Sequence, residues 1–341
     1  MEPFDPPFQE FYKKLFDDHF FNGPCPGGHE IEFSHNAKEC KFELPLIDLS
    51  HLNIGGFKHE DCKREIAKAA QEWGFFQVVN HGVSHDILEK LMSEQVKVFK
   101  KPFQVKVNGL PELNFPAGSY QWGTPSANCL QQLAWSESFH VPLIELSTVG
   151  ACAATDFSKI VKQYAMIISK LANELAEILA EMLGQKSDFF KENCVPSMCY
   201  IRMSRYPACP FSPEVFGLMP HTDSDFLTIL HQDHIGGLQV LKDGKWISVN
   251  PKQKTLIVIV GDLFEAWSNG VFKSVEHRVI ANKQFERFST AYFLCPSFET
   301  MIESSEKSLI YKRFSFREFR QQVQDDVKRY GRKIGLSRFI L

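Results

Sequence analysis

Residues 237–249 read GLQVLKDGKWISV, which is two short apolar runs joined by Asp243-Gly244. An Asp-Gly pair between two such runs is a strong hairpin signal, because both turn positions take a positive φ. More short runs of this kind occupy the neighbouring sequence at residues 197–205, 225–231, 255–260, 277–281 and 287–294. So many short strands without intervening helices predict a jelly roll or barrel in the second half of the chain.

Helical patterns flank this β region. Apolar residues recur at spacings of three and four over residues 156–183, and Gly184 provides a stop. We also expect helices at 8–16, 58–73, 85–101 with Ser84 as its cap, and 314–330 with Ser315 as its cap. Strands are expected at 43–49 and 75–79, and residues 102–156 are expected to be irregular. The fold class is therefore α+β, with helices around a β core.

Composition excludes several classes of function. The formal net charge of the 341 residues is -3, and no basic stripe is present, so neither nucleic acid nor an anionic membrane surface is an expected partner. No run of about 18 apolar residues predicts a transmembrane helix, and the first residues lack a secretory signal. The nine cysteines form no C-x-x-C pair, which favours free thiols and a cytoplasmic location. None of these patterns predicts an oligomeric state.

The main candidate for chemistry is His221-Thr222-Asp223. Residues two apart in a strand share one face, so this imidazole and carboxylate could hold one cation. His277, on a later expected strand, is the best third ligand. Two histidines and one carboxylate on one face of a metal leave the other face open, as iron(II) oxygenases require. An isolated H-x-D arises often by chance, and a zinc hydrolase could use the same ligands.

Arg287 and Ser289 strengthen the iron hypothesis, because they open an expected strand and share one of its faces. A guanidinium binds a carboxylate through two parallel hydrogen bonds, and a hydroxyl can add another. The pair could therefore hold the distal carboxylate of a dicarboxylic co-substrate whose other end chelates the metal. Tyr206 offers a further hydroxyl, although a buried tyrosine needs a partner in any protein.

At these residues the chain resembles the plant 2-oxoglutarate- and iron(II)-dependent dioxygenases, over roughly residues 42–340. The resemblance implies a double-stranded β-helix (jelly-roll) core with an N-terminal helical region and a C-terminal helix. It implies iron(II) at His221, Asp223 and His277, and 2-oxoglutarate at Tyr206, Arg287 and Ser289. Dioxygen would be a co-substrate, and ascorbate would support turnover. The implied regions are a variable extension (1–40), a helical region (41–194), the β core (195–300), and a final helix and tail (301–341).

Within that family, the chain looks most similar to gibberellin 2-beta-dioxygenases of the class that acts on twenty-carbon gibberellins. The stretches that carry this similarity are 117–120, 122–127, 135–140, 217–226 and 316–323. The similarity implies hydroxylation of an apolar carboxylic acid at carbon 2, coupled to decarboxylation of 2-oxoglutarate to succinate, which lowers active gibberellin. The chain departs from the usual family pattern at four positions. Gln121 replaces an arginine, Ser204 replaces an asparagine, Ala208 replaces a proline and Glu265 replaces a glutamine.

Two alternatives remain open from the sequence. The same chemistry could act on a flavonoid or another plant specialised metabolite, or the fold could serve a non-catalytic binding protein. A decayed member should have lost a metal ligand or Arg287, and this chain has lost neither. Tyr120, Trp122 and Phe226 are candidates for substrate contact, and core packing explains each of them equally well.

Overall fold

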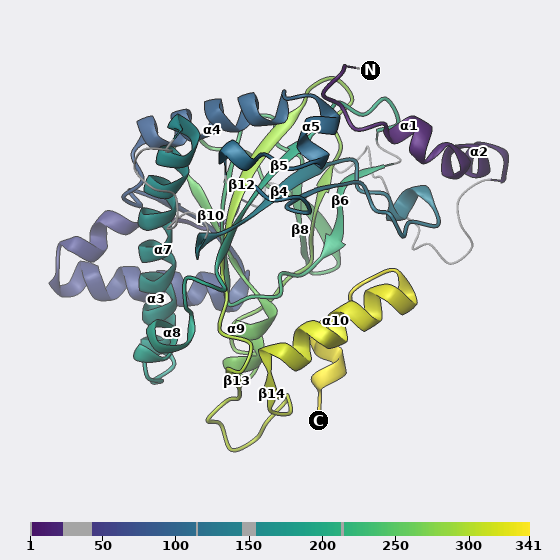
Figure 1. The fold of residues 1–341 in the computed structure, drawn as a ribbon. Coiled ribbons are helices and arrows are strands. Elements are labelled where there is room, and N and C mark those ends of the chain that lie inside the picture. Colours follow the sequence, from purple (N-terminus) through teal and green to yellow (C-terminus); the bar gives the residue numbers. More distant parts are fainter. Residues whose placement is uncertain (1, 23–42, 114, 145–154, 213–214) are drawn as a thin grey trace.

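The computed structural model describes residues 2–22, 43–113, 115–144, 155–212 and 215–341, and eight strands of this part of the chain form one large sheet (Figure 1). Their order across the sheet is β1-β2-β10-β7-β12-β5-β4-β3. Every neighbouring pair is antiparallel except β1 and β2. The strands are β1 (Leu46–Asp48), β2 (Phe75–Val79), β3 (Tyr120–Trp122), β4 (Glu137–Pro142), β5 (Tyr200–Tyr206), β7 (Leu227–Gln232), β10 (Leu256–Val260) and β12 (Arg287–Leu294).

A second sheet faces the first and has the order β6-β11-β8-β9 among the described strands. These strands are β6 (Phe216–His221), β8 (Leu238–Lys242), β9 (Lys245–Ser248) and β11 (His277–Ile280). The β8–β9 hairpin turns at Asp243 and Gly244, whose φ angles of 50° and 74° match the Asp-Gly signal.

An apolar core lies between the two sheets. Leu230 and Ile257 of the large sheet and Leu238 and Val240 of the small sheet belong to one buried cluster. The two packed sheets confirm the predicted α+β class with a double-stranded β-helix core. Their inner faces provide the only surface that both sheets share, so side chains brought in from both sheets can meet there.

Three long helices cover the outer face of the large sheet: α3 (Gly56–Glu72), α4 (His85–Phe99) and α7 (Asp156–Met182) (Figure 1). The predicted apolar stripe of α7 is buried, and it packs against β7 and β12 as well as against the other two helices. The predicted cap of α4 is confirmed, since the Ser84 hydroxyl accepts a hydrogen bond from the Ile87 N–H at 3.3 Å. This layer makes the large sheet a rigid support for its inner face.

The prediction that residues 102–156 are irregular is wrong. The segment contains helix α5 (Phe103–Val107) and strands β3 and β4, which extend the large sheet beyond β5. In β4, Phe139 and Val141 face the helices, while Ser138 and His140 face the other way. The strand is short, and prolines and glycines surround it, so the alternation was too brief to stand out.

The two ends of the chain pack on different sides of the β core (Figure 1). Near the N-terminus, α1 (Phe8–Phe11) and α2 (Lys13–Asn22) replace the single helix expected at 8–16. Near the C-terminus, α10 (Phe316–Tyr330) begins with a complete capping box between Ser315 and Glu318 and ends at Gly331, which confirms the predicted helix. The remaining elements are α8 (Asp188–Asn193), α9 (Asp262–Trp267), β13 (Met301–Ile302), β14 (Phe314–Ser315), and the 3₁₀ turns at Leu49–Asn53, Pro111–Leu113, Leu130–Gln132 and Gly335–Phe339.

Candidate metal and co-substrate site

His221 and His277 meet because their strands are paired. His221 is the last residue of β6, His277 is the first of β11, and the two are direct cross-strand partners. Each Nε2 lies 3.7 Å from Asp223 Oδ1. One ligand atom from each of the three residues lies within 4.8 Å of the others. These are the residues that the sequence predicted, and the structure brings them together.

The prediction that His221 and Asp223 share one face of a strand is wrong. The strand ends at His221, so Asp223 lies in the loop after β6 and does not share a strand face with it. The backbone holds this loop instead: the Asp262 N–H donates to the Asp223 carbonyl at 3.0 Å. The carboxylate reaches the histidines because the chain turns at this point.

Both imidazoles are oriented by backbone carbonyls. His221 Nδ1 lies 2.7 Å from the Met219 carbonyl oxygen, and His277 Nδ1 lies 3.2 Å from that of Val275. A proton on each Nδ1 donates to the carbonyl and leaves the Nε2 lone pair toward Asp223. Burial, followed by the nearby His277, lowers the pKa of His221 to about 3. His221 is therefore neutral near pH 7, the form that binds a metal.

Asp223 is held as a carboxylate by its surroundings. Burial acts to raise its pKa, but His277, His221 and the Thr228 hydroxyl outweigh burial, and the pKa is lowered. Thr228 donates to Asp223 Oδ2 at 2.6 Å, which leaves Oδ1 toward the two histidines. Burial and the neighbouring Asp223 raise the pKa of Asp225 well above its usual value. Thr228 and Asp225 were not predicted, although Asp225 lies two residues from the motif.

Tyr206, Arg287 and Ser289 also come together. Arg287 pairs with Tyr206 across β12 and β5, and its guanidinium carbon lies 4.8 Å from the centre of the tyrosine ring. Arg287 Nη1 donates to the Ser289 hydroxyl at 3.3 Å, and Nη2 donates to Gln232 Oε1 at 2.9 Å. The three predicted residues are all buried, at 6%, 2% and 4% exposure respectively.

Arg287 has no ion-pair partner among the described residues, and its Nε has no hydrogen-bond acceptor there. The nearby Asp233 instead accepts hydrogen bonds from the backbone N–H groups of Phe288 and Ile235. A buried guanidinium without a direct ion pair is costly, so this geometry fits an anionic ligand that supplies a carboxylate in contact with it. Two imidazoles and one carboxylate likewise fit a divalent iron ion.

The metal residues and the arginine lie on facing sheets. A Cβ atom placed on Gly217 of β6 would come within 2.8 Å of the Tyr206 ring, so the backbone of β6 passes directly over that ring. Thr228, which supports Asp223, is on β7 beside β12, the strand that carries Arg287 and Ser289. The arginine and the metal residues therefore belong to the facing inner surfaces of two sheets that pack closely together.

The substrate contacts suggested for three aromatic residues are not what the structure shows. Tyr120 donates its hydroxyl to the buried Glu137. Phe226 is fully buried among Phe190 and Phe264. Trp122 packs against the N-terminal helices, which makes core packing the role of all three side chains.

Comparisons with known proteins agree with this site. The profile of the 2OG-Fe(II) oxygenase superfamily matches residues 193–296, and that of the non-haem dioxygenase in morphine synthesis N-terminal region matches residues 44–147. The chain is 53% identical to gibberellin 2-beta-dioxygenase 8 of Arabidopsis thaliana over 98% of both chains. It is 44% identical to gibberellin 2-beta-dioxygenase 5 of Oryza sativa subsp. japonica over 98% of this chain and 96% of that one. A crystal structure of JOX2 with 2OG, Fe and JA has 29% identity and a TM-score of 0.70, covering 82% of this chain and 84% of that one.

Proposed function

This chain belongs to the 2OG-Fe(II) oxygenase superfamily, and on that basis we propose that it hydroxylates gibberellins at carbon 2. The observation that carries the proposal is the pairing of two sites on facing sheets. One is the His221–Asp223–His277 cluster, and the other is a buried Arg287 that forms no ion pair with the described residues. Relatives that share 41–53% identity over nearly the whole chain carry the gibberellin 2-beta-dioxygenase name.

His221 Nε2, His277 Nε2 and Asp223 Oδ1 would hold iron(II). The backbone carbonyls of Met219 and Val275 fix the two imidazoles, and Thr228 fixes the carboxylate. These outer contacts keep the three ligand atoms in place before the metal arrives, which favours binding.

Arg287 would hold the distal carboxylate of 2-oxoglutarate, with Ser289 and Tyr206 beside it. The guanidinium is already oriented by Gln232 and by the tyrosine ring beneath it. A bound carboxylate would supply the ion-pair partner that Arg287 lacks, and it would direct the oxo-acid end toward the metal residues.

When bound, iron(II) and 2-oxoglutarate activate dioxygen, so that one oxygen atom enters the substrate as hydroxyl, the other enters succinate, and carbon dioxide leaves. The protein contributes position and a dry environment. The apolar cluster between the sheets excludes water around Tyr206, and His221 stays neutral.

The twenty-carbon class is the finer part of this proposal. It is supported by the similarity at residues 117–120, 122–127 and 135–140. Parts of these stretches form β3 and β4, whose residues Gln121, Ser138 and His140 share the inner face of the large sheet with Ser289. We therefore expect the inner-face residues of β3 and β4 to distinguish the gibberellin classes.

The enzyme acts on a small molecule, and we place it in the cytoplasm, since the six described cysteines are free thiols. None of the helices within the described ranges is long and apolar enough to cross a bilayer.

The test is a coupled assay in which purified protein is loaded with iron(II) and 2-oxoglutarate without oxygen and air is then admitted. Succinate and product are followed by mass spectrometry with a twenty-carbon gibberellin, a nineteen-carbon gibberellin, a flavonoid, and no substrate. Substrate-dependent succinate and a gain of one oxygen on a gibberellin are expected, with the twenty-carbon compound faster. Succinate without an oxygenated gibberellin would keep the oxygenase and overturn the substrate.

A further inference from the structure

The inner face of the large sheet carries a cation that the catalytic site does not use. His140, Arg202 and Ala291 are direct partners across β4, β5 and β12. Ala291 packs against the apolar cluster between the sheets, so this row points inward. Ser204 and Ser289 are cross-strand partners in a neighbouring row. Arg202 lies two residues before Ser204 on the same strand, so the two rows are about 7 Å apart.

The same row lies close to the metal residues. Tyr200 and Phe293, two residues farther along β5 and β12, are cross-strand partners, and Phe293 in turn pairs with Thr228. Thr228 is the residue that bonds Asp223. Arg202 therefore lies between the row that holds 2-oxoglutarate and the row that supports the metal, where a substrate has to lie.

Arg202 is half-buried, yet its guanidinium makes no hydrogen bond or ion pair within the described ranges of the chain. The neighbouring Arg205, whose side chain points to the opposite face, shows the contrast: it bonds Asp5, Glu137 and Glu286. Five N–H donors on a partly desolvated cation favour a ligand that supplies acceptors.

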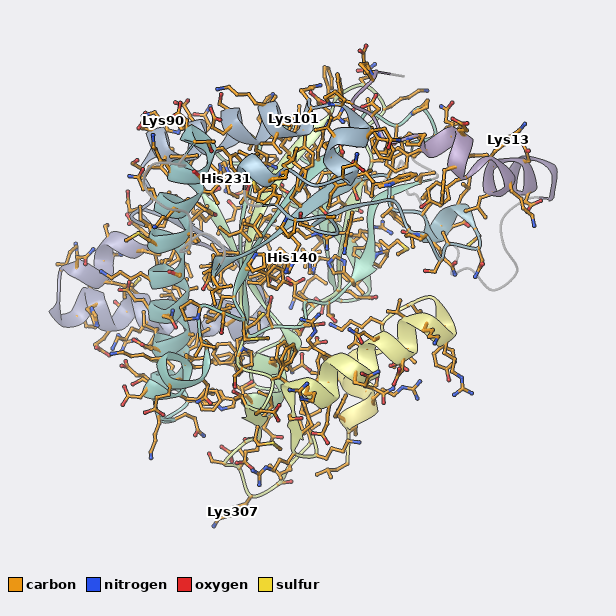
Figure 2. The ribbon with its side chains drawn as sticks, in the orientation of Figure 1. Lys13, Lys90, Lys101, His140, His231 and Lys307 are labelled. Atoms are coloured by element: carbon orange, nitrogen blue, oxygen red, sulfur yellow. The ribbon has the colours of Figure 1, made fainter. Side chains whose placement is uncertain are left out.

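A second cation approaches from the C-terminal helix. Arg320 of α10 is exposed, forms no ion pair in the described part of the chain, and lies near the rings of Phe298 and Phe316. Desolvation, followed by the charges of Arg202 and Arg320, lowers the pKa of His140 to about 4, so both guanidinium groups act electrostatically on this partly desolvated imidazole. Figure 2 labels His140 near the middle of the view, above α10.

Flat apolar surface adjoins the cations. The rings of Tyr200 on β5 and Phe293 on β12 stack with their centroids 4.5 Å apart. On the other side of β5, the His140 ring of β4 lies 4.2 Å from the Tyr200 ring. His140 is open to solvent, and Tyr200, Phe293 and Arg202 are partly open, so the small sheet leaves this end of the inner face uncovered. Two unpaired cations beside an aromatic surface suit an apolar molecule that carries a carboxylate.

We propose that Arg202 and Arg320 clamp a carboxylate of the substrate, with its ring skeleton against Tyr200 and Phe293 and with His140 beside them. This clamp rests on the proposed function and deepens it, because it names the group that orients a gibberellin between the 2-oxoglutarate and metal residues. It also predicts that the enzyme rejects uncharged relatives of its substrate.

The test compares a gibberellin with its methyl ester, which removes the charge and keeps the skeleton. Anaerobic titration calorimetry is run on protein loaded with iron(II) and 2-oxoglutarate, using wild type, Arg202→Gln, Arg202→Lys, Arg320→Gln and the control Arg329→Gln. Arg329 is exposed on the last turn of the same helix and contacts Tyr330. Arg320 is exposed, so Arg320→Gln should fold normally. It tests the clamp even if the Arg202 variants fail to fold.

Wild type and Arg329→Gln are expected to bind the acid about 10- to 100-fold more tightly than the ester. Arg202→Gln and Arg320→Gln should lose most of that preference by weakening for the acid alone, with Arg202→Lys between them and wild type. Variants that keep the full preference, or a wild type that binds both forms equally, would overturn the clamp and leave the proposed function standing. A wild type that binds neither form would overturn both.

Discussion

Lys333 places its ammonium nitrogen 2.6 Å from Asp262 Oδ2. The same nitrogen donates to the Thr222 carbonyl at 2.9 Å and to the Ser224 hydroxyl at 2.7 Å. Thr222 and Ser224 are the neighbours of Asp223 in the chain, and the Asp262 N–H bonds the Asp223 carbonyl. One lysine after the last long helix therefore braces the loop that carries the carboxylate ligand.

Lys333→Met should weaken iron(II) binding by about 10- to 100-fold, because outer contacts of this kind hold a ligand in place. The measurement is anaerobic iron(II) titration, with the exposed Lys328→Met on α10 as the matched control. An iron affinity equal to that of wild type and of the control would show that the loop holds its shape without Lys333.

Arg287→Lys should raise the dissociation constant for 2-oxoglutarate by about 10-fold or more, since an ammonium group cannot make the two parallel bonds of the fork. Ser289→Ala, which removes one hydroxyl, should cost less than Arg287→Lys. Binding is measured by anaerobic titration of the iron-loaded protein. Equal effects from both variants, or no effect from Arg287→Lys, would place the distal carboxylate elsewhere.

Gln121→Arg should lower the apparent Michaelis constant for a gibberellin. Gln121 is exposed on β3 and lies in one cross-strand row with Ser138, Ser204 and Ser289, so an arginine there adds a cation to the inner face. Steady-state kinetics with varied gibberellin at saturating 2-oxoglutarate measure the effect. An unchanged or raised constant would remove position 121 from substrate anchoring.

Glu137→Gln should lower the free energy of unfolding by about 3–5 kcal/mol, the usual effect of breaking a buried ion pair. Glu137 and Lys106 have fully buried side chains in contact with each other, and Arg205 donates to the same carboxylate at 2.6 Å. Glu299→Gln removes one partner of Arg317 in an exposed pair and should cost less than about 1 kcal/mol. Urea unfolding of both variants measures the two losses in free energy of unfolding. Similar losses would mean that the buried ion pairs of Glu137 stabilise the fold no more than an exposed pair does.

Stability should fall as the pH drops from about 6.5 toward 4. Burial, with smaller effects of His81 and His85, lowers the pKa of His231 to about 4, so the unfolded chain binds a proton in this window and the folded chain does not. The loss at pH 5 is at most about 2 kcal/mol from this residue. Urea unfolding at pH 7 and pH 5 should show a smaller pH effect for His231→Gln. An equal loss in the variant would assign the effect to other groups.

Much of the site could be predicted from the sequence, because its residues lie in short local patterns. His221, Asp223 and His277 were identified by type and spacing, and Arg287 and Ser289 by alternation in one strand. The β8–β9 hairpin and the ends of α4, α7 and α10 were predicted from their turn and capping residues. These features depend on a few neighbouring residues, so they can be read without a structure.

What could not be predicted depends on contacts between distant segments. Lys333 reaches the metal loop from 111 residues away, and Thr228 supports Asp223 only because the chain turns after His221. Arg202 was missed for a similar reason. Tyr200, Arg202, Ser204 and Tyr206 alternate on one inward face of β5, but only pairing with β12 shows that this face adjoins Ser289 and Arg287.

The most direct test of the central claim follows single atoms through one turnover. A gibberellin deuterated at both positions of carbon 2 is incubated with the iron-loaded enzyme and 2-oxoglutarate under ¹⁸O₂, and the product and succinate are analysed by mass spectrometry. The account predicts that the product loses one deuterium and gains one ¹⁸O, with one ¹⁸O also in succinate. A product that keeps both deuterium atoms, or an oxygen that comes from water, would contradict hydroxylation at carbon 2 by this site.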